Sequence, residues 1–446
     1  MPRIVVVSPP FASHAVPLAT LARSLGARGA EVFLACAEEF AHLAQGDGVR
    51  FIPLTVTRNA NTGVAEATRQ PLEEAARLGE FLEATRAGAV PTLLTQARHR
   101  RADMLADPEG VLRKLRALDE RLRPDWYVTD QLSFAVTLAL HCMGAPYATF
   151  CPGHPTYLPA GPEAYFGVPY DWPRALRPDD KDADRLLVAA RENDRAFTDM
   201  YHAFVRRHVP SAPLPPRAFA LASPHAVVHG YPDLPWLPRP IGGPARLFAG
   251  HMVPPHSPPL DSAWSSRLER LRRSTDRIVL VAFGTFLSAR DDVLRTVIEG
   301  VLKGLPDTGV IAAAGQRSPA LADLEGDRAV VAATVPQQGL LHHVDAMVHH
   351  GGGNSFTECL RAGLPALVLP FSSDQFAVAR DAERLGAGIV ADPNTLKHVE
   401  VRTALDDLRG LVGDGARGGT SQLRSRGPRW AAGHLLSVMA ERAPGR

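Results

Sequence analysis

The chain has 446 residues, 45% of them apolar, with 49 basic against 47 acidic side chains. This length suggests two domains of ordinary size, or three at most. The balanced charge argues against a nucleic-acid partner, because nucleic-acid binders concentrate a basic excess on one face. Arginines alternate with acidic residues, as at residues 381–384, and this alternation predicts solvated helix surface.

Cysteine usage and the apolar runs bear on the compartment. The four cysteines are scattered, without a C-x-x-C pair, so a disulfide framework is not expected and a reducing environment fits better. Residues 4–7 are too short an apolar run for a signal peptide, and no stretch approaches the roughly 20 apolar residues that span a bilayer. We therefore expect a cytoplasmic protein without a membrane partner.

The amino-terminal half opens with a strand, a helix and a strand. Residues 4–7 form a β-branched run bounded by Ser8-Pro9-Pro10, apolar residues recur at helical spacing over 18–25, and 32–35 predict a second strand. This βαβ unit implies a parallel sheet. The other elements expected in this half are helices over 60–120, a strand over 125–129 ending at Asp130, a loop rich in Pro, Gly and Tyr over 152–182, and a helix over 184–207.

The carboxy-terminal half repeats the alternation of strands and helices. A Pro- and His-rich linker is expected over 249–259, followed by a clear strand over 278–283. Further strands are expected over 309–313, 329–332, 346–349, 366–369 and 388–391. We therefore predict an α/β protein with two doubly wound, Rossmann-like parallel-sheet domains that face each other across a cleft at the carboxyl ends of their strands.

A glycine-rich turn joins the strand over 346–349 to a helix. Its glycines let backbone N–H groups approach an anion, and the helix terminus adds unpaired donors and a partial positive charge. His350 can donate to a phosphate oxygen, and Asn354 and Ser355 can cap the helix or bind phosphate. Three glycines alone fit equally well a tight turn without a ligand.

The residues after this turn favour a ligand. Glu358 lies one helical turn beyond Asn354, where its carboxylate can accept hydrogen bonds from ribose hydroxyls. Asp374 and Gln375 end a later loop, and an acid beside an amide offers several acceptors and a donor for sugar hydroxyls. Together with the turn, they indicate a site for a nucleotide diphosphate sugar.

These motifs resemble a known family. The pattern is His350-x-Gly352-x-Asn354-Ser355-x-x-Glu358, then Gly363-x-Pro365, Pro370 and Asp374-Gln375. It is similar to the donor-binding signature of the UDP-glycosyltransferase family of GT-B fold, which includes plant natural-product glucosyltransferases and bacterial antibiotic or macrolide glycosyltransferases. Upstream, the segments that resemble the family are Phe283-Gly284-Thr285 and Val335-Pro336-Gln337.

The resemblance implies a role for each matching residue. Those expected to bind the diphosphate are Gly284, Thr285, His350, Gly352, Asn354 and Ser355. Glu358 would bind the ribose, Asp374 and Gln375 the transferred sugar, and Val335 and Gln337 the base. Many members stack an aromatic ring on the base at the position of Thr334, so the choice between a UDP-sugar and a dTDP-sugar stays open.

Catalysis is expected from the amino-terminal half. The segment Ser13-His14-Ala15-Val16-Pro17 resembles the family's catalytic histidine, three residues before a proline, although Ser13 stands where glycine is usual. An imidazole can take the proton of an acceptor hydroxyl, and a carboxylate orients such a ring. Asp130 resembles the family's partner acid. Taken without the family, His14 would be a surface or capping residue and Asp130 a helix N-cap.

The resemblance therefore implies a hexosyltransferase that inverts the anomeric carbon, uses no metal or cofactor, and modifies a hydroxyl or other nucleophile of a small natural product in antibiotic or secondary metabolism. The expected division is an acceptor-binding domain over 1–255, a donor-binding domain over 256–425, and a helix over 426–446 that packs back on the first domain. His342, His343, His349 and His350 straddle element ends and point apart, which disfavours a zinc site.

The acceptor is the least determined partner. The loop over 152–182 carries His154, Tyr157, Tyr165, Tyr170 and Trp172, which could line the cleft or serve only in packing. A GT-B-fold epimerase or phosphorylase, and a catalytically inactive activator protein, stay open as alternatives because fold alone does not determine function. The sequence also leaves a homodimer open.

Overall fold

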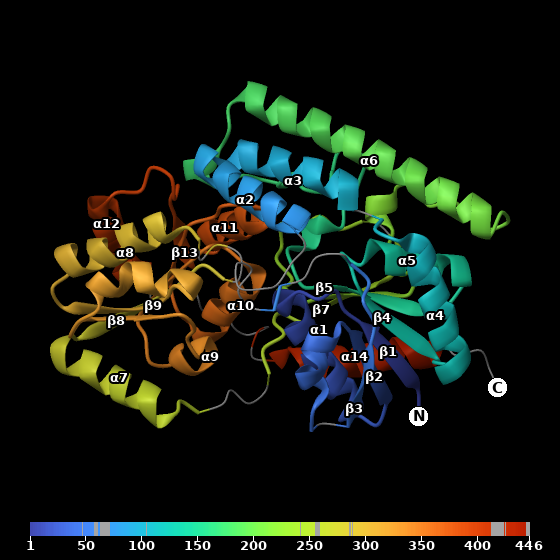
Figure 1. Ribbon diagram of the computed structural model, residues 1–446, viewed down its shortest axis with the longest axis horizontal. Coiled ribbons are helices and arrows are strands. Elements are labelled where there is room, and N and C mark those ends of the chain that lie inside the picture. Colours follow the sequence, from blue (N-terminus) through green and yellow to red (C-terminus); the bar gives the residue numbers. More distant parts are fainter. Residues whose placement is uncertain are drawn as a thin grey trace.

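The computed structural model describes residues 1–46, 48–57, 61–62, 72–103, 105–240, 242–254, 259–284, 287, 289–411, 423 and 425–442. Two parallel sheets lie beside each other, each covered by helices (Figure 1). The prediction of an α/β protein with two doubly wound domains is confirmed. No helix within these described ranges is both long and apolar enough to cross a membrane.

The first sheet has seven parallel strands in the order β3-β2-β1-β4-β5-β6-β7. They are β1 (Arg3–Val7), β2 (Glu31–Cys36), β3 (Val49–Pro53), β4 (Trp126–Asp130), β5 (Tyr147–Cys151), β6 (Ala226–His229) and β7 (Ala245–Phe248). Its helices are α1 (Ala12–Gly26), α2 (Leu72–Ala87), α3 (Ala89–Asp103), α4 (Pro108–Leu122), α5 (Phe134–Met143) and α6 (Asp180–His208). Sequence reasoning named β1, β2 and β4 and left the other four strands unassigned.

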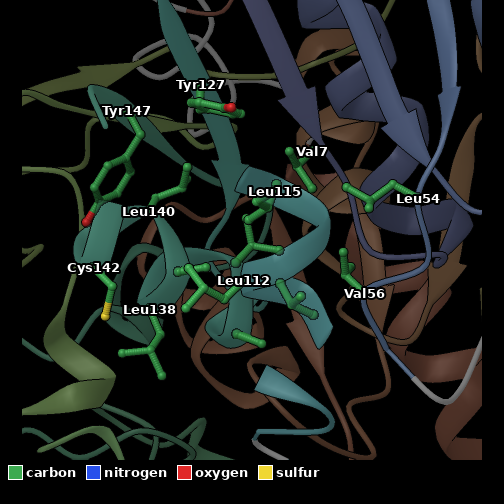
Figure 2. Close-up of a cluster of buried hydrophobic side chains, with 14 of the residues drawn as sticks. Val7, Leu54, Val56, Leu112, Leu115, Tyr127, Leu138, Leu140, Cys142 and Tyr147 are labelled. Atoms are coloured by element: carbon green, nitrogen blue, oxygen red, sulfur yellow. The ribbon is translucent and has the colours of Figure 1, made fainter. Parts of the chain in front are cut away.

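Both faces of β1 are buried, which explains its unbroken apolar run. Val5 and Val7 belong to one core with α4 and α5, whereas Ile4 and Val6 belong to a second core on the opposite face. Figure 2 shows the first core, where Val7 lies among side chains of α4, such as Leu115, and of the segment after β3. This packing fixes β1 at the centre of the sheet, next to β4.

The second sheet has six parallel strands in the order β10-β9-β8-β11-β12-β13. They are β8 (Arg277–Ala282), β9 (Thr308–Ala313), β10 (Ala329–Ala332), β11 (Ala346–His349), β12 (Ala366–Val368) and β13 (Gly388–Val390). Its helices are α7 (Ser262–Ser274), α8 (Asp291–Gly304), α9 (Gln337–Leu340), α10 (Gly353–Ala362), α11 (Gln375–Arg384) and α12 (His398–Leu411). Every strand predicted in this half is present, and each differs by one residue or less at either end.

The last helix, α14 (Pro428–Glu441), returns to the first domain. Ala431 and Leu435 are fully buried in the same core as Leu18 of α1. In Figure 1 this helix crosses the first sheet, although the chain has just left the second. Strand β1 and helix α14 therefore belong to the same core.

A buried carboxylate joins the two domains. Asp381 of α11 is fully buried, and its oxygens accept hydrogen bonds from four side chains of the first domain: His154 (3.0 Å), Tyr170, Tyr231 (2.9 Å) and Trp236 (2.7 Å). Burial alone would raise the pKa of Asp381, but His154 and the other donors outweigh it and hold that pKa below its usual range. The expectation of solvated surface at this position is wrong, because the charge pattern of α11 does not reveal these distant donors.

Replacing this carboxylate tests its contribution to stability. In Asp381→Asn, one acceptor oxygen becomes a donor that faces other donors, so we expect the free energy of unfolding to fall by about 2–4 kcal/mol. Chemical denaturation followed by circular dichroism measures the change. Asp171→Asn is the matched control, because Asp171 also pairs across the domains, with Arg380 at 2.7 Å, but is 27% exposed. An equal loss in both variants would contradict the special role of Asp381.

Candidate functional site

The predicted site residues lie where the strand order of each sheet reverses. His14 follows β1 and Asp130 ends β4, and these two strands are neighbours at the reversal point of the first sheet. Gly284 follows β8 and His350 follows β11, the corresponding neighbours in the second sheet. Open parallel sheets bind their ligands in the crevice at this point.

His14 and Asp130 form a hydrogen-bonded pair, with Nδ1 of His14 2.9 Å from Oδ2 of Asp130. The Asp130 side chain is fully buried, whereas that of His14 is 18% exposed. The other carboxylate oxygen accepts the backbone N–H of Leu132 at 2.8 Å. Because a carboxylate only accepts, Nδ1 carries the proton and Nε2 is left as the basic nitrogen. Asp130 does not cap α5, whose N-cap is Ser133.

The surroundings of His14 favour its charged form. Burial alone would lower the pKa of the imidazole, but the charge of Asp130, its hydrogen bond and the charge of Asp374 outweigh burial and raise that pKa. The contribution of Asp374 also matters for geometry. It brings a residue of the second domain into the electrostatic environment of a residue of the first.

The glycine-rich turn is shaped around the ring of His350. A Cβ atom on Gly352 would lie 2.4 Å from Nε2 of His350, and one on Gly284, whose φ is +69°, would lie 2.6 Å from Cε1. The ring of His350 therefore lies between the backbone at Gly284 and the backbone at Gly352. A larger residue at either position would force the ring or the backbone to move. Burial lowers the pKa of His350 to about 4, so the ring is neutral near pH 7.

Helix α10 begins at the end of this turn without a side-chain cap. Its N-cap residue is Gly352, which has no side chain to accept from the first backbone N–H groups of the helix. Those donors and the positive end of the helix dipole together form an arrangement that suits an anion.

Three residues of the predicted donor site meet next to α10. Glu358 accepts a hydrogen bond from Nε2 of Gln337 at 2.6 Å, and the same nitrogen lies 3.3 Å from Oγ of Ser355. Gln338 also donates to Glu358, at 3.1 Å, although sequence reasoning did not name it. Burial raises the pKa of Glu358 and outweighs these two donors. Val335 packs at the edge of the core beneath α7.

The loop that carries Asp374 is held by both domains. Gln96 of α3 donates to Oγ of Ser373 at 2.8 Å and accepts from its backbone N–H at 3.0 Å. The backbone N–H of His154 donates to Oδ2 of Asp374 at 2.8 Å. Ser373 has a left-handed φ of +55°, an unusual conformation for a residue other than glycine. Sequence reasoning missed Gln96 and Ser373, because no local pattern marks a pair this far apart in the chain.

Gln375 shapes this loop from within. Its side-chain oxygen accepts the backbone N–H groups of Phe371, at 2.9 Å, and Ser372, at 3.0 Å. Its side chain is buried, whereas Asp374 is partly exposed. Of the predicted sugar-binding pair, Asp374 is therefore the member that this conformation presents to a ligand.

Some of the residues predicted to line an acceptor cleft are buried in packing contacts, whereas others line a cavity. His154 is fully buried, with its ring nitrogens bonded to Thr156 and Asp381, so the expectation that it lines an open cleft is wrong. Trp172 packs on Phe376, with ring centres 5.2 Å apart. Tyr165 and Tyr170 line a cavity of about 210 Å³. The hydroxyl of Tyr157 is buried. Thr285 lies outside the described residues.

The chain is similar to one protein family and to several solved structures. Residues 302–426 match the model of the family described as erythromycin biosynthesis protein CIII-like, C-terminal domain. The glycosyltransferase of kitacinnamycin has a TM-score of 0.67 at 21% identity, covering 98% of this chain and 99% of its own. The calicheamicin glycosyltransferase CalG4 also scores 0.67, at 17% identity, covering all of both chains. The glycosyltransferase VinC, solved with dTDP, scores 0.63 at 21% identity, covering 98% of this chain and all of its own.

The chain has the fold of these glycosyltransferases, and the family model matches part of its second domain. The resemblance recognised from the motifs is thereby confirmed. Curated sterol 3-beta-glucosyltransferases are similar over a shorter region. That of Aspergillus fumigatus is 35% identical over 141 residues, 29% of this chain and 10% of its own length, and that of Yarrowia lipolytica is 33% identical over 128 residues, 27% and 9%. The chain thus spans about a tenth of these relatives.

Removing the charge of Asp130 tests the electrostatics of the candidate site. Burial of His14 lowers its pKa, and the charge and hydrogen bond of Asp130 are the main opposing influences. We therefore expect Asp130→Asn to lower the pKa of His14, so that the basic form persists to more acidic pH than in the wild type. NMR titration of the labelled imidazole measures this. Asp125→Asn, at the opposite end of the β4 segment, is the control and should leave the pKa unchanged; an unchanged value in Asp130→Asn would contradict the account.

Proposed function

We propose that the chain transfers a sugar from a nucleoside diphosphate sugar to a hydroxyl group of a small natural product, with inversion at the anomeric carbon and without a metal ion. The observation that carries the proposal is the meeting of two halves of a site. The His14–Asp130 pair belongs to the first sheet and the uncapped end of α10 to the second, yet Asn354 of α10 bonds the backbone carbonyl of Ser13 at 3.0 Å.

The proposed chemistry is a single displacement. Nε2 of His14 takes the proton of the acceptor hydroxyl as its oxygen forms a bond to the anomeric carbon. The bond from that carbon to the diphosphate breaks, and its electron pair leaves with the diphosphate. Asp130 stabilises the imidazolium that forms, as in other His–Asp pairs. Attack and departure on opposite faces of the sugar ring account for the inversion.

The leaving group would be stabilised by the turn before α10. Negative charge grows on the diphosphate as its bond to the sugar breaks, and backbone donors fixed in advance stabilise such charge effectively. The N–H groups at the start of α10 and the dipole of that helix supply this potential. In this scheme they do the work that a divalent cation does in other transferases.

The donor is proposed to lie along α10. Glu358 would accept from the ribose hydroxyls, Gln337 and Val335 would lie beside the base, and Asp374 would accept from the hydroxyls of the transferred sugar. Thymidine diphosphate stands in the titles of two similar structures, those of VinC and the spinosyn rhamnosyltransferase SpnG. We therefore propose a pyrimidine nucleoside diphosphate, with dTDP and UDP as the two donors to compare.

An antibiotic-type aglycone is the proposed acceptor. This is supported by similarity over the whole chain to glycosyltransferases named for kitacinnamycin, spinosyn and calicheamicin. A sterol is less well supported, because the sterol glucosyltransferases match only about 30% of this chain. Tyr165 and Tyr170 supply aromatic surface in the loop region after β5, where we propose that part of the acceptor lies.

A transfer assay tests this function. The chain is incubated with dTDP- and UDP-sugars and a panel of hydroxylated polyketides and sterols, and products are detected by mass spectrometry and assigned at the anomeric carbon by NMR. We expect a sugar-sized mass gain with inverted configuration. His14→Ala should lower the rate about 100- to 10,000-fold, because the general base is lost. EDTA should leave the rate unchanged.

The outcomes separate the alternatives. Nucleotide binding without any product would indicate an inactive activator, and conversion of the nucleotide sugar without an acceptor would indicate an epimerase or a phosphorylase. Undiminished transfer by His14→Ala would contradict the assignment of the base. Loss of transfer in EDTA that Mg²⁺ restores would contradict metal independence.

A further inference from the structure

Pro17 removes one backbone hydrogen bond from the first turn of α1, at the carbonyl of Ser13, which directly precedes His14. In a regular α-helix the backbone N–H of residue 17 would donate to the carbonyl of residue 13. Proline has no N–H, so the carbonyl of Ser13 lacks that intrahelical donor. This carbonyl belongs to the peptide group that joins Ser13 to His14. A donor that binds it would restrain the backbone of His14 directly.

The second domain supplies such a donor. Nδ2 of Asn354 lies 3.0 Å from the carbonyl oxygen of Ser13, although 341 residues separate the two in sequence. Asn354 is in the first turn of α10, two residues after the N-cap Gly352. The start of α10 is also tightly packed against the first domain, because a Cβ atom on Gly353 would lie 3.3 Å from the carbonyl oxygen of Pro152. Asn354 therefore links the turn proposed for the diphosphate to the turn that bears His14.

We infer that the side chain of Asn354 positions His14 and is not itself a ligand of the diphosphate. This inference rests on the proposed function. Phosphate oxygens are acceptors, so within this side chain only the two N–H groups on Nδ2 could bind them, and Nδ2 already donates to Ser13. The two contacts on either side of His14 then act together. Asp130 fixes the ring through Nδ1, and Asn354 fixes the backbone through the preceding carbonyl.

This arrangement gives the His14–Pro17 spacing a physical reason. Because Pro17 lies four residues after Ser13, it removes the backbone N–H that would otherwise bind the carbonyl of Ser13. The same Pro17 lies three residues after His14. The base would be held in its working position only while α10 is docked against the first domain. Docking of the second domain against the first would thus also align His14 for catalysis.

The test compares catalysis with nucleotide binding in Asn354→Ala. We expect kcat at saturating donor and acceptor to fall about tenfold, which is the effect of one lost hydrogen bond on a reacting geometry. The Kd values of UDP and dTDP, measured by calorimetry, should stay within about twofold of those of the wild type. In a Pro17→Ala background the new N–H of residue 17 can bond Ser13, so the same Asn354→Ala change should cost less than about threefold.

Asn394→Ala is the matched control. Asn394 donates its side-chain amide to the carbonyl of Thr85 at 3.0 Å, so it too joins the second domain to a backbone carbonyl of the first. It also accepts from the buried Arg290 at 2.9 Å, which makes its loss at least as disruptive to the interface. The kcat of Asn394→Ala should nevertheless stay within about twofold of that of the wild type.

Three results would overturn the inference. A tenfold or greater weakening of UDP and dTDP binding in Asn354→Ala would make Asn354 a phosphate ligand. An unchanged kcat in that variant would remove its role at His14, and an equal fall in Asn394→Ala would reduce the effect to general weakening of the interface. If the wild type neither binds these nucleotides nor forms product, the proposed function fails first, and the inference fails with it.

Discussion

The order of the strands in the two parallel sheets is the constraint on which the rest of this structure depends. In each sheet the first three strands are added in one direction, and the next strand then pairs with the free edge of the first. The loops after β1 and β4 therefore run in opposite directions, as do the loops after β8 and β11. His14 and Asp130 occupy the first of these points, and Gly284 and His350 the second. The hydrogen bond between Asn354 and Ser13 joins one point to the other.

Each domain completes the site of the other. The loop that presents Asp374 belongs to the second domain, yet Gln96 and the backbone of His154 in the first domain hold its shape. Conversely, the buried carboxylate of Asp381 in the second domain binds the ring of His154. Burying this carboxylate would be costly on its own, and its hydrogen-bond donors offset that cost. The contacts between the two domains therefore also hold the residues of the candidate site in place.

The sequence predicted local features and the His14–Asp130 pair that the family resemblance names, but it missed the other distant contacts. The strands of the second sheet are short apolar runs between turn residues, and the donor signature from His350 to Glu358 is contiguous, so both could be recognised. Asp381 could not, because it lies in a charged helix and its bond to His154 spans 227 residues. Gln96 and Ser373 are 277 residues apart, and no periodicity marks either of them. The proline of the His14–Pro17 motif could be seen, but the carbonyl that it leaves for Asn354 required the fold.

A crystal structure with bound nucleoside diphosphate tests the central claim most directly, namely that both domains form one transfer site. The account predicts the diphosphate at the amino end of α10, with phosphate oxygens within hydrogen-bond distance of the backbone N–H groups that follow His350. It also predicts that Nε2 of His14 faces the same gap while Nδ1 keeps its bond to Asp130. A diphosphate bound away from α10, or a His14 ring turned away from the nucleotide, would contradict the account.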